Sequence, residues 1–451
     1  MSPAAKELRV PAGGCAHDKT ILTLALVLRL AVVSMVLFCY PRKWLFSKAP
    51  DLGFLASSLS SGHGLSSPFG GSTGPTAFLA PGYPAILGLV FRLFGSYSFG
   101  SAAAIMGLQT VFAVLTVAMI MHVARRIFGA PTANLAGVFW AVSPPLIWLP
   151  AVLWETSLST LFLIGMVALA IQAENNLGKG LWVVMGAYCG LAMLVNPSLM
   201  PALFVILGWT IHQTRPGFPL RCSWSVRACG FHQGQPHEVH YLTKLHRKSG
   251  RFVWRYGPWI CGLTLLAVFA PWPIRNARVL HAFIPLRSNF GYEVWQGNHP
   301  GGTGIFDARL EPLQNKHEYA DYAAKGEVAY MDNKSTLAKA YIRAQPLKFI
   351  RLSAERVVRF WTGAGSESNS SAVEVHTAVT SLLGLVGLAA LFKHGRARAM
   401  LFLLPIIVFP LPYYITHPDF RFRLVLDPLL TILGAYAVIR ASSYWKTKHE
   451  A

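Results

Sequence analysis

Charged residues are scarce in this sequence, and acidic residues are the scarcest of them. Asp, Glu, Lys and Arg make up 13% of the 451 residues, whereas an ordinary soluble domain carries roughly 25%. Only 19 residues are acidic, so each carboxylate beside an apolar segment is a candidate functional group, because an unpaired charge there is costly. Cysteine is also rare, since the 6 cysteines are scattered and form no CxxC pair. These shortages exclude an ordinary soluble domain and a disulfide-rich scaffold.

Hydrophobic residues are abundant instead, at 53% of the chain, and they form long runs. A run of about 20 residues spans a bilayer, so the pattern predicts a polytopic membrane protein with about ten transmembrane helices and both ends in the cytoplasm. The first run is not followed by an A-x-A cleavage site, and we interpret it as an uncleaved span. The predicted spans are approximately Ile21–Tyr40, Ser101–Val123, Ala133–Leu149, Val152–Ala173, Leu181–Val195, Leu199–His212, Trp259–Trp272, Val373–Phe392, Met400–Ile415 and Val425–Tyr444.

Basic residues are in excess, and the net charge is +21. In a membrane protein this excess indicates cytoplasmic loops and contact with anionic lipid headgroups. The spans argue against a nucleic-acid partner. By the positive-inside rule, the ends of the spans that carry Arg125 and Arg126 lie in the cytoplasm.

The runs divide the chain into five segments. We predict an N-terminal transmembrane catalytic module (1–213) with a first outer loop (41–100), a basic cytoplasmic linker (214–257), a transmembrane helix (258–274), an outer-face soluble segment (275–372) and C-terminal transmembrane helices (373–451). The linker contains cysteines and histidines whose spacing fits no established zinc site, so no metal site is predicted there. They are Cys222, Cys229, His232, His237 and His240.

The first outer loop contains two short helical segments. Apolar residues recur from Leu52 to Leu59 at the spacing of one helical face, which favours a helix lying on the membrane. The segment Pro81–Phe94 covers only about 21 Å at 1.5 Å per residue, against a hydrocarbon core of about 30 Å, so we predict a second juxtamembrane helix rather than a span. The expected fold is therefore an all-α polytopic membrane protein with these two helices and a small outer-face region of helices and loops.

Two carboxylates near the predicted outer surface are candidate catalytic groups. Asp51 follows the first span and could act as a general base, or it could be the N-cap of the next helix. Glu155 stands at the start of a span and could bind a sugar hydroxyl or assist Asp51. The alternative for Glu155 is an acid that the helix dipole favours at an N-terminus.

Cations on the same predicted side are candidate ligands for a phosphate. Arg421 and Arg423 lie on the outer side, where the positive-inside rule disfavours them, which indicates an anionic partner. The alternative is that both arginines extend to lipid headgroups. Lys48, close to Asp51, is a third candidate for holding an anionic leaving group.

Aromatic and amide residues are candidates for substrate binding. The motif GYEVWQGNHPGG contains Trp295, Asn298 and His299 and suits sugar recognition by stacking and hydrogen bonding, although it equally suits a tight structural turn. Tyr83 and His417 complete the predicted substrate-binding set. No pair of carboxylates has the spacing of metal ligands, so no metal or other cofactor is predicted, and metal dependence is not readable from the sequence.

Several motifs occur in the order seen in one superfamily. The first loop contains an acidic residue followed by Ala-x-Ser-Leu, glycines and Ser-x-Pro-Phe, here Asp51, Ala56, Ser58, Leu59, Gly62, Gly64, Leu65, Ser66, Pro68 and Phe69. With GPTAFLAPGYP, ARRIFG, WETSLS, PWPIRNARV, SNFGYEVWQGN and HPDFRFRLVLDP, the chain resembles the GT-C glycosyltransferases. These include protein O-mannosyltransferases and lipid A aminoarabinose transferases. Many relatives have Glu at the position of Asp51 and Phe at that of Leu65.

The resemblance implies a glycosyltransferase of a bacterial inner membrane, with its active site facing the outside of the cell. The donor would be a polyprenyl-phosphate sugar and the acceptor a lipid, glycan or protein. Asp51 would deprotonate the acceptor in a single inverting displacement, with Glu155 as the second acid, while Lys48, Arg421 and Arg423 hold the leaving phosphate. The alternatives are a transporter or lipid flippase, and a non-catalytic membrane scaffold. The two halves of the chain show none of the internal similarity typical of many transporters.

Overall fold

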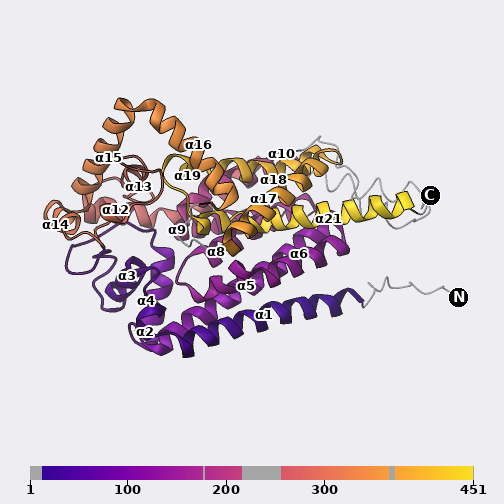
Figure 1. Ribbon diagram of the computed structural model, residues 1–451, viewed down its shortest axis with the longest axis horizontal. Helices are drawn as coiled ribbons and strands as arrows, with labels where there is room; N and C mark the ends of the chain where they lie inside the picture. Colours follow the sequence, from indigo (N-terminus) through magenta and orange to yellow (C-terminus); the bar gives the residue numbers. More distant parts are fainter. Residues whose placement is uncertain (1–12, 176–177, 216–254, 365–370, 450–451) are drawn as a thin grey trace.

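The computed structural model describes residues 13–175, 178–215, 255–364 and 371–449. In these ranges the chain is helical and forms no β-strand, which confirms the predicted all-α fold. The cysteines and histidines of the predicted linker lie outside the described residues. The helices of the bundle run side by side along the long axis of the molecule (Figure 1). They are α1 (Gly13–Cys39), α5 (Phe99–Phe128), α6 (Ala130–Val142), α8 (Thr156–Asn175), α9 (Lys179–Val195), α10 (Met200–Gln213), Arg255–Leu280, whose last part is α12 (Pro271–Leu280), α17 (Ser371–Phe392), α18 (Arg396–Val408) and α21 (Asp427–His449).

Six helices among the described residues are long and apolar enough to cross a membrane, and a multi-pass membrane protein follows from them. A seventh span results if α6 and the segment Pro144–Ala151, which meet at an angle of 64°, are counted together. The predicted count of about ten is not confirmed. Helices α9 and α10 lie in the bundle but have 17 and 14 residues, which cover only about 26 and 21 Å. Helix α21 carries Arg440 and, further on, two lysines, and is not among the candidate spans.

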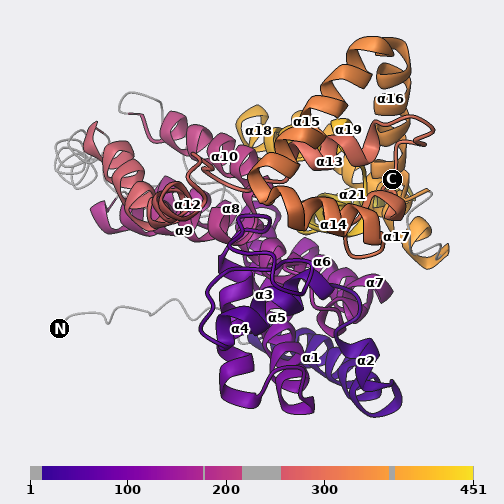
Figure 2. The same ribbon diagram turned by 90° about the vertical axis from the view of Figure 1, so that its left-hand side faces the viewer.

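Short helices and loops gather at one end of the bundle, which we call the loop-rich end (Figures 1 and 2). The two helices predicted in the first loop are present there as α3 (Pro50–Ser60) and α4 (Gly82–Phe94). The start of α1 and the end of α21 lie at the opposite end (Figure 1). The remaining helices are α2 (Arg42–Leu45), α7 (Pro144–Trp148), α13 (Phe290–Gly297), α14 (Lys316–Lys325), α15 (Glu327–Ala344), α16 (Pro346–Thr362), α19 (Leu411–Ile415) and α20 (Phe420–Leu424).

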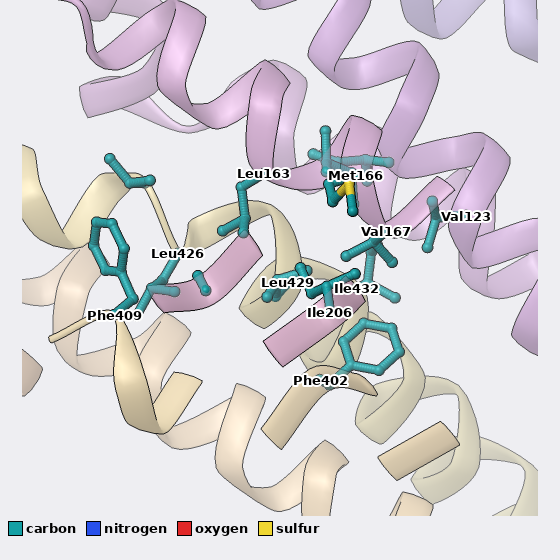
Figure 3. Packing of buried hydrophobic residues seen from close by; sticks show 14 of the residues in the cluster. Val123, Leu163, Met166, Val167, Ile206, Phe402, Phe409, Leu426, Leu429 and Ile432 are labelled. Atoms are coloured by element: carbon teal, nitrogen blue, oxygen red, sulfur yellow. The ribbon is translucent and has the colours of Figure 1, made fainter. Parts of the chain in front are cut away.

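The bundle packs around aliphatic and aromatic side chains from distant parts of the chain. Figure 3 shows Leu163 and Val167 of α8, Phe402 of α18 and Leu429 of α21 among the side chains of this core. Helices α17 and α21 approach each other closely at Gly387, where a β-carbon would collide with the Leu433 carbonyl. Small residues at such contacts allow helix backbones to pack closely in a membrane protein.

A buried carboxylate fixes the first loop against the later helices. Glu327, at the start of α15, accepts hydrogen bonds from the Thr76 hydroxyl, from the Ala77 amide at 2.7 Å and from the Tyr322 hydroxyl at 2.9 Å. Arg275 of α12 donates to the carbonyls of Thr76 and Leu65 at 2.7 and 2.9 Å. These bonds hold residues 65–77 in place and so define where α3 and α4 stand relative to α13 to α15.

Candidate active site

Asp51 is the second residue of α3. Pro50 opens this helix, because the fixed φ of proline suits the first helical turn and its missing amide hydrogen is not needed there. The N-cap is Ala49, which makes no side-chain capping bond, so the interpretation of Asp51 as the N-cap is wrong. The Asp51 carboxylate accepts a hydrogen bond from the backbone amide of Leu52.

Burial raises the pKa of Asp51 above the usual range for a carboxyl group. The negative charge of Glu155 raises it further, whereas the Leu52 amide and the positive charges of Arg421 and Arg287 lower it, and the net effect is an increase. A carboxylate whose proton affinity is increased in this way is a better general base than an exposed one.

Glu155 immediately precedes α8 and lies beside the segment that leads into α3. The link is the neighbouring Trp154, whose indole nitrogen donates to the Lys48 carbonyl at 3.3 Å. Glu155 interacts electrostatically with Asp51 and with Arg421. The structure therefore brings together the two carboxylates that were selected from the sequence.

Tyr83 of α4 lies near Glu155. Its side chain is 2% exposed, and its hydroxyl has no hydrogen-bond partner among the described residues. Burial and the nearby charge of Glu155 raise the pKa of Tyr83. A buried hydroxyl without a hydrogen-bond partner costs free energy. The Tyr83 hydroxyl is therefore available to form a hydrogen bond with a bound ligand.

Arg421 of α20 is the cation on which these carboxylates converge. Its Nε lies 3.1 Å from Oδ2 of Asp419, and its guanidinium lies over the ring of Trp154 with 5.2 Å between Cζ and the ring centre. Burial alone would lower the pKa of Arg421, but Asp419 and the three carboxylates of Glu155, Asp51 and Glu293 raise it. Arg421 is therefore charged and faces acids from three other parts of the chain.

Glu293 of α13 is a third carboxylate at the site, and the sequence analysis did not select it. Its Oε2 lies 2.8 Å from His417 Nε2, and its Oε1 accepts a hydrogen bond from the Asn289 amide at 2.7 Å. Burial would raise the pKa of Glu293, but the bond to His417 and the charges of Arg287 and Arg421 outweigh it and lower the pKa. Glu293 is the one acid in the motif GYEVWQGN, and the scarcity of acids was the signal that could have identified it.

Arg287 is a second cation that the sequence analysis missed. Its Nε donates to the Phe78 carbonyl at 3.1 Å, which ties it to the first loop. Arg287 also interacts electrostatically with Asp51 and Glu293. We refer to Asp51, Glu155, Glu293, Arg287 and Arg421 as the charged cluster.

Arg423 does not join the charged cluster, although it is two residues from Arg421. It is 1% exposed and forms an ion pair with Asp427. It also donates to Thr380 at 3.1 Å and Ser381 at 2.9 Å of α17. The second oxygen of Asp427 lies 2.8 Å from His376 Nε2. The guanidinium of Arg423 is therefore engaged inside the bundle.

Other predicted site residues lie around the charged cluster or apart from it. The Lys48 side chain is exposed. Trp295 lies two residues after Glu293 on α13, and its indole nitrogen is buried without a partner among the described residues. Asn298 donates to the carbonyls of Val294 and Ile415, both at 2.8 Å, so its amide holds α13 against α19.

His299 lies in a separate group at the end of α13. Its Nε2 is 3.3 Å from Oδ2 of Asp307, and its Nδ1 is 3.0 Å from the Pro300 carbonyl. Burial lowers the pKa of His299, although Asp307 opposes this effect. In the part of the chain that the structure describes, no group of three or more His, Cys, Asp or Glu residues could hold a metal ion.

Known proteins are similar to this chain in sequence over one region and in fold over most of its length. Residues 79–225 match the family described as dolichyl-phosphate-mannose-protein mannosyltransferase. The solved structure of the oligosaccharyltransferase AglB from Archaeoglobus fulgidus, in complex with an inhibitory peptide and a dolichol-phosphate, is 14% identical with a TM-score of 0.50 and covers 96% of this chain and 52% of that chain. The chain is therefore similar in sequence to this mannosyltransferase family over residues 79–225, and similar in fold to a membrane oligosaccharyltransferase over most of its length.

These similarities agree with the resemblance to membrane glycosyltransferases found in the sequence. A further structure of the Archaeoglobus fulgidus oligosaccharyltransferase, complexed with Zn and sulfate, is 15% identical with a TM-score of 0.49 and covers 94% of this chain and 49% of that chain. ArnT from Cupriavidus metallidurans, bound to undecaprenyl phosphate, is 14% identical with a TM-score of 0.35, with coverages of 92% and 78%. The chain thus spans about half the length of the oligosaccharyltransferases that it matches. No curated protein matches it.

Proposed function

We propose that this protein is a GT-C glycosyltransferase, which transfers a sugar from a polyprenyl-phosphate donor to an acceptor hydroxyl or amine at the charged cluster. The observation that carries the proposal is the convergence of Asp51, Glu155 and Glu293, from three separate parts of the chain, on Arg421. Such a cluster supplies both a base for the acceptor and cations for a phosphate. The AglB structure with the same fold contains a dolichol-phosphate, which supports a lipid-linked phosphate donor here.

In the proposed reaction Asp51 takes the proton of the acceptor. The acceptor oxygen or nitrogen attacks the anomeric carbon from the face opposite the phosphate, so the configuration inverts. The bond between that carbon and the phosphate oxygen breaks, and polyprenyl phosphate leaves with the electron pair. Because the leaving group is an anion, it needs cations rather than a proton, and Arg421 and Arg287 fill this role.

The remaining residues of the site orient the substrates. Glu155 and the Tyr83 hydroxyl would bind sugar hydroxyl groups, and Glu293 would keep His417 oriented beside the cations. Neither Lys48 nor Arg423 receives a role at the phosphate, because the first is exposed and the second is paired with Asp427.

An apolar hollow lined by residues of α13 and α19 would accommodate part of the prenyl chain. It has a volume of about 400 Å³, and its lining includes Phe290 of α13 and Ile415 of α19, which precede Glu293 and His417 in the chain. The full lining is Pro201, Phe290, Val408, Leu411, Pro412, Tyr414 and Ile415. A chain held there would place its phosphate toward the charged cluster.

Asparagine at position 51 tests the catalytic base. Asp51→Asn keeps the size of the side chain but removes the basic carboxylate, and we expect transfer to fall about 10²–10⁴-fold. Asp51→Glu should retain measurable transfer, because it keeps a carboxylate. The measurement is the glycan or glycolipid that disappears when the gene is deleted and returns when a variant is expressed. Asp332→Asn, at an exposed position of α15, is the matched control, and full restoration by Asp51→Asn at equal protein level would refute the assignment.

The proposal also puts the loop-rich end outside a bacterial inner membrane. Ser72 is exposed in the first loop. A Ser72→Cys variant should therefore react in whole cells with a thiol reagent that cannot cross membranes. Reaction only after the cells are opened would mean that the loop-rich end faces the cytoplasm.

A further inference from the structure

Helix α16 exposes a row of apolar side chains along one side. Leu347, Ile350 and Val358 are 81%, 62% and 59% exposed, and Ala354 and Val357 are exposed as well. Counted from Leu347, these residues occur at i, i+3, i+7, i+10 and i+11, which places them on one face of an α-helix. We call this face the α16 stripe. A continuous apolar row of this kind marks a surface that contacts another apolar phase or partner.

The opposite face of α16 is buried against the site. Arg356 is fully buried and donates to the Gly304 carbonyl at 2.9 Å and to Asn298 Oδ1 at 2.9 Å. Leu352 and Phe360 on this face are both 2% exposed. The α16 stripe therefore points away from the protein, and its direction is fixed by buried contacts.

A charged edge runs along the α16 stripe. It consists of Lys348, Arg351, Glu355 and Arg359, in which three positive charges outnumber one negative charge. Arg351 Nε lies 3.2 Å from Glu355 Oε1, and Arg359 Nη2 lies 4.0 Å from Glu355 Oε2. An apolar face beside a basic edge is typical of helices that lie in the interface of a bilayer.

The position of α16 in the chain indicates that it lies close to the membrane surface. Only residues 363–370 separate it from α17, which is one of the candidate spans. Figure 1 shows α16 running from α15 back towards the bundle, and Figure 2 shows it at the edge of the molecule. A helix that connects so directly to a span at the edge of the bundle is close to the depth at which headgroups meet acyl chains.

We propose that α16 is an interfacial helix that docks on the bilayer surface through the α16 stripe. The apolar side chains would enter the acyl-chain boundary, and Lys348, Arg351 and Arg359 would contact headgroup phosphates. The buried face of the same helix contacts the ends of α13 and α19, so the lipid surface would also brace these site segments. The proposal does not depend on the catalytic assignment of Asp51.

Lipid-attached quenchers test this docking directly. Ile350→Cys and Val358→Cys are labelled with an environment-sensitive fluorophore in a chain whose Cys15, Cys39, Cys222 and Cys229 are replaced by serine, while the buried Cys189 and Cys261 are kept. The matched control is Ala340→Cys at an exposed position of α15. Each protein is placed in nanodiscs of phosphatidylcholine and phosphatidylglycerol, with and without doxyl-labelled lipid.

We expect blue-shifted emission and strong doxyl quenching at positions 350 and 358, and weaker quenching at position 340. Thermal unfolding in detergent checks that each variant is folded. Quenching at positions 350 and 358 no stronger than at position 340 would overturn the proposal. Blue-shifted emission without doxyl quenching would also overturn it, since it would show that protein, such as a second copy of this chain, covers the α16 stripe.

Discussion

Replacing Arg356 by methionine should strongly destabilise the loop-rich end. Arg356 is fully buried, and its guanidinium bonds to the carbonyls of Gly304 and Gly297 and to Asn298 Oδ1. It also donates to the Ile415 carbonyl at 3.4 Å. The side chain thus joins α16 to the segment after α13 and to the end of α19. Burial lowers the pKa of Arg356 to about 10, which still leaves it charged at neutral pH.

The size of the effect follows from the acceptors that methionine leaves behind. Methionine fills a similar space but donates no hydrogen bond, so the oxygens of Gly304, Gly297 and Asn298 lose this donor. Each buried polar group left unsatisfied costs about 1–3 kcal/mol. The substitution also removes the cost of burying a guanidinium, which offsets part of the loss. We therefore expect Arg356→Met to lower the free energy of unfolding by about 3 kcal/mol.

Arg351→Met on the same helix is the matched control. The Arg351 side chain is 75% exposed and pairs with Glu355 four residues later. Exposed pairs of this kind contribute about 0.3–0.5 kcal/mol. The assay is unfolding of the purified protein in detergent, followed by temperature or denaturant, for both variants side by side. If Arg356→Met is no more destabilising than Arg351→Met, the reasoning from buried hydrogen bonds is refuted.

Two further predictions concern the charges at and beside the site. If Asp51 is the base, transfer should rise with pH through a midpoint above the usual carboxyl range, because burial raises the pKa of Asp51. Arg421→Gln removes a positive charge that lowers the pKa of Asp51, so the midpoint of the pH–rate profile should move to higher pH. An unmoved midpoint would contradict the role of Asp51. Asp427→Asn should cost about 3–5 kcal/mol in unfolding experiments, because it leaves Arg423 buried and unpaired. The double variant Arg423→Met/Asp427→Leu should recover most of that loss of stability. If the double variant is as unstable as Asp427→Asn, the unpaired Arg423 is not the cause of the loss.

Much of the fold could be predicted because membrane helices are encoded locally. In the hydrocarbon core of a bilayer a long apolar run has no water to bind its backbone groups. It satisfies its backbone hydrogen bonds within itself by forming a helix. The short helices α3 and α4 also followed from local pattern and length. The number of spans did not, because segments such as α9 and α10 are intermediate in length, and their position depends on the helices around them.

The residues of the candidate site were likewise predictable only in part from local sequence. Scarcity of acids and the positive-inside rule selected Asp51, Glu155 and Arg421, and the structure brings these three together. The same rule selected Arg423, which turns into the bundle. Side chains two residues apart on a short helix point in different directions, and no local pattern states which of the two faces the site.

The sequence by itself determined the fold class, the resemblance to membrane glycosyltransferases and the chemical character of the first loop around Asp51. These properties depend on composition and on motifs that are contiguous in the chain. Only the tertiary structure decided which distant residues share the site. Glu293 and Arg287 lie with Asp51, Glu155 and Arg421 because Glu327 and Arg275 hold the first loop against the later helices. These contacts join residues 250 and 199 positions apart, and contacts so distant in the chain leave no periodic signal in the sequence.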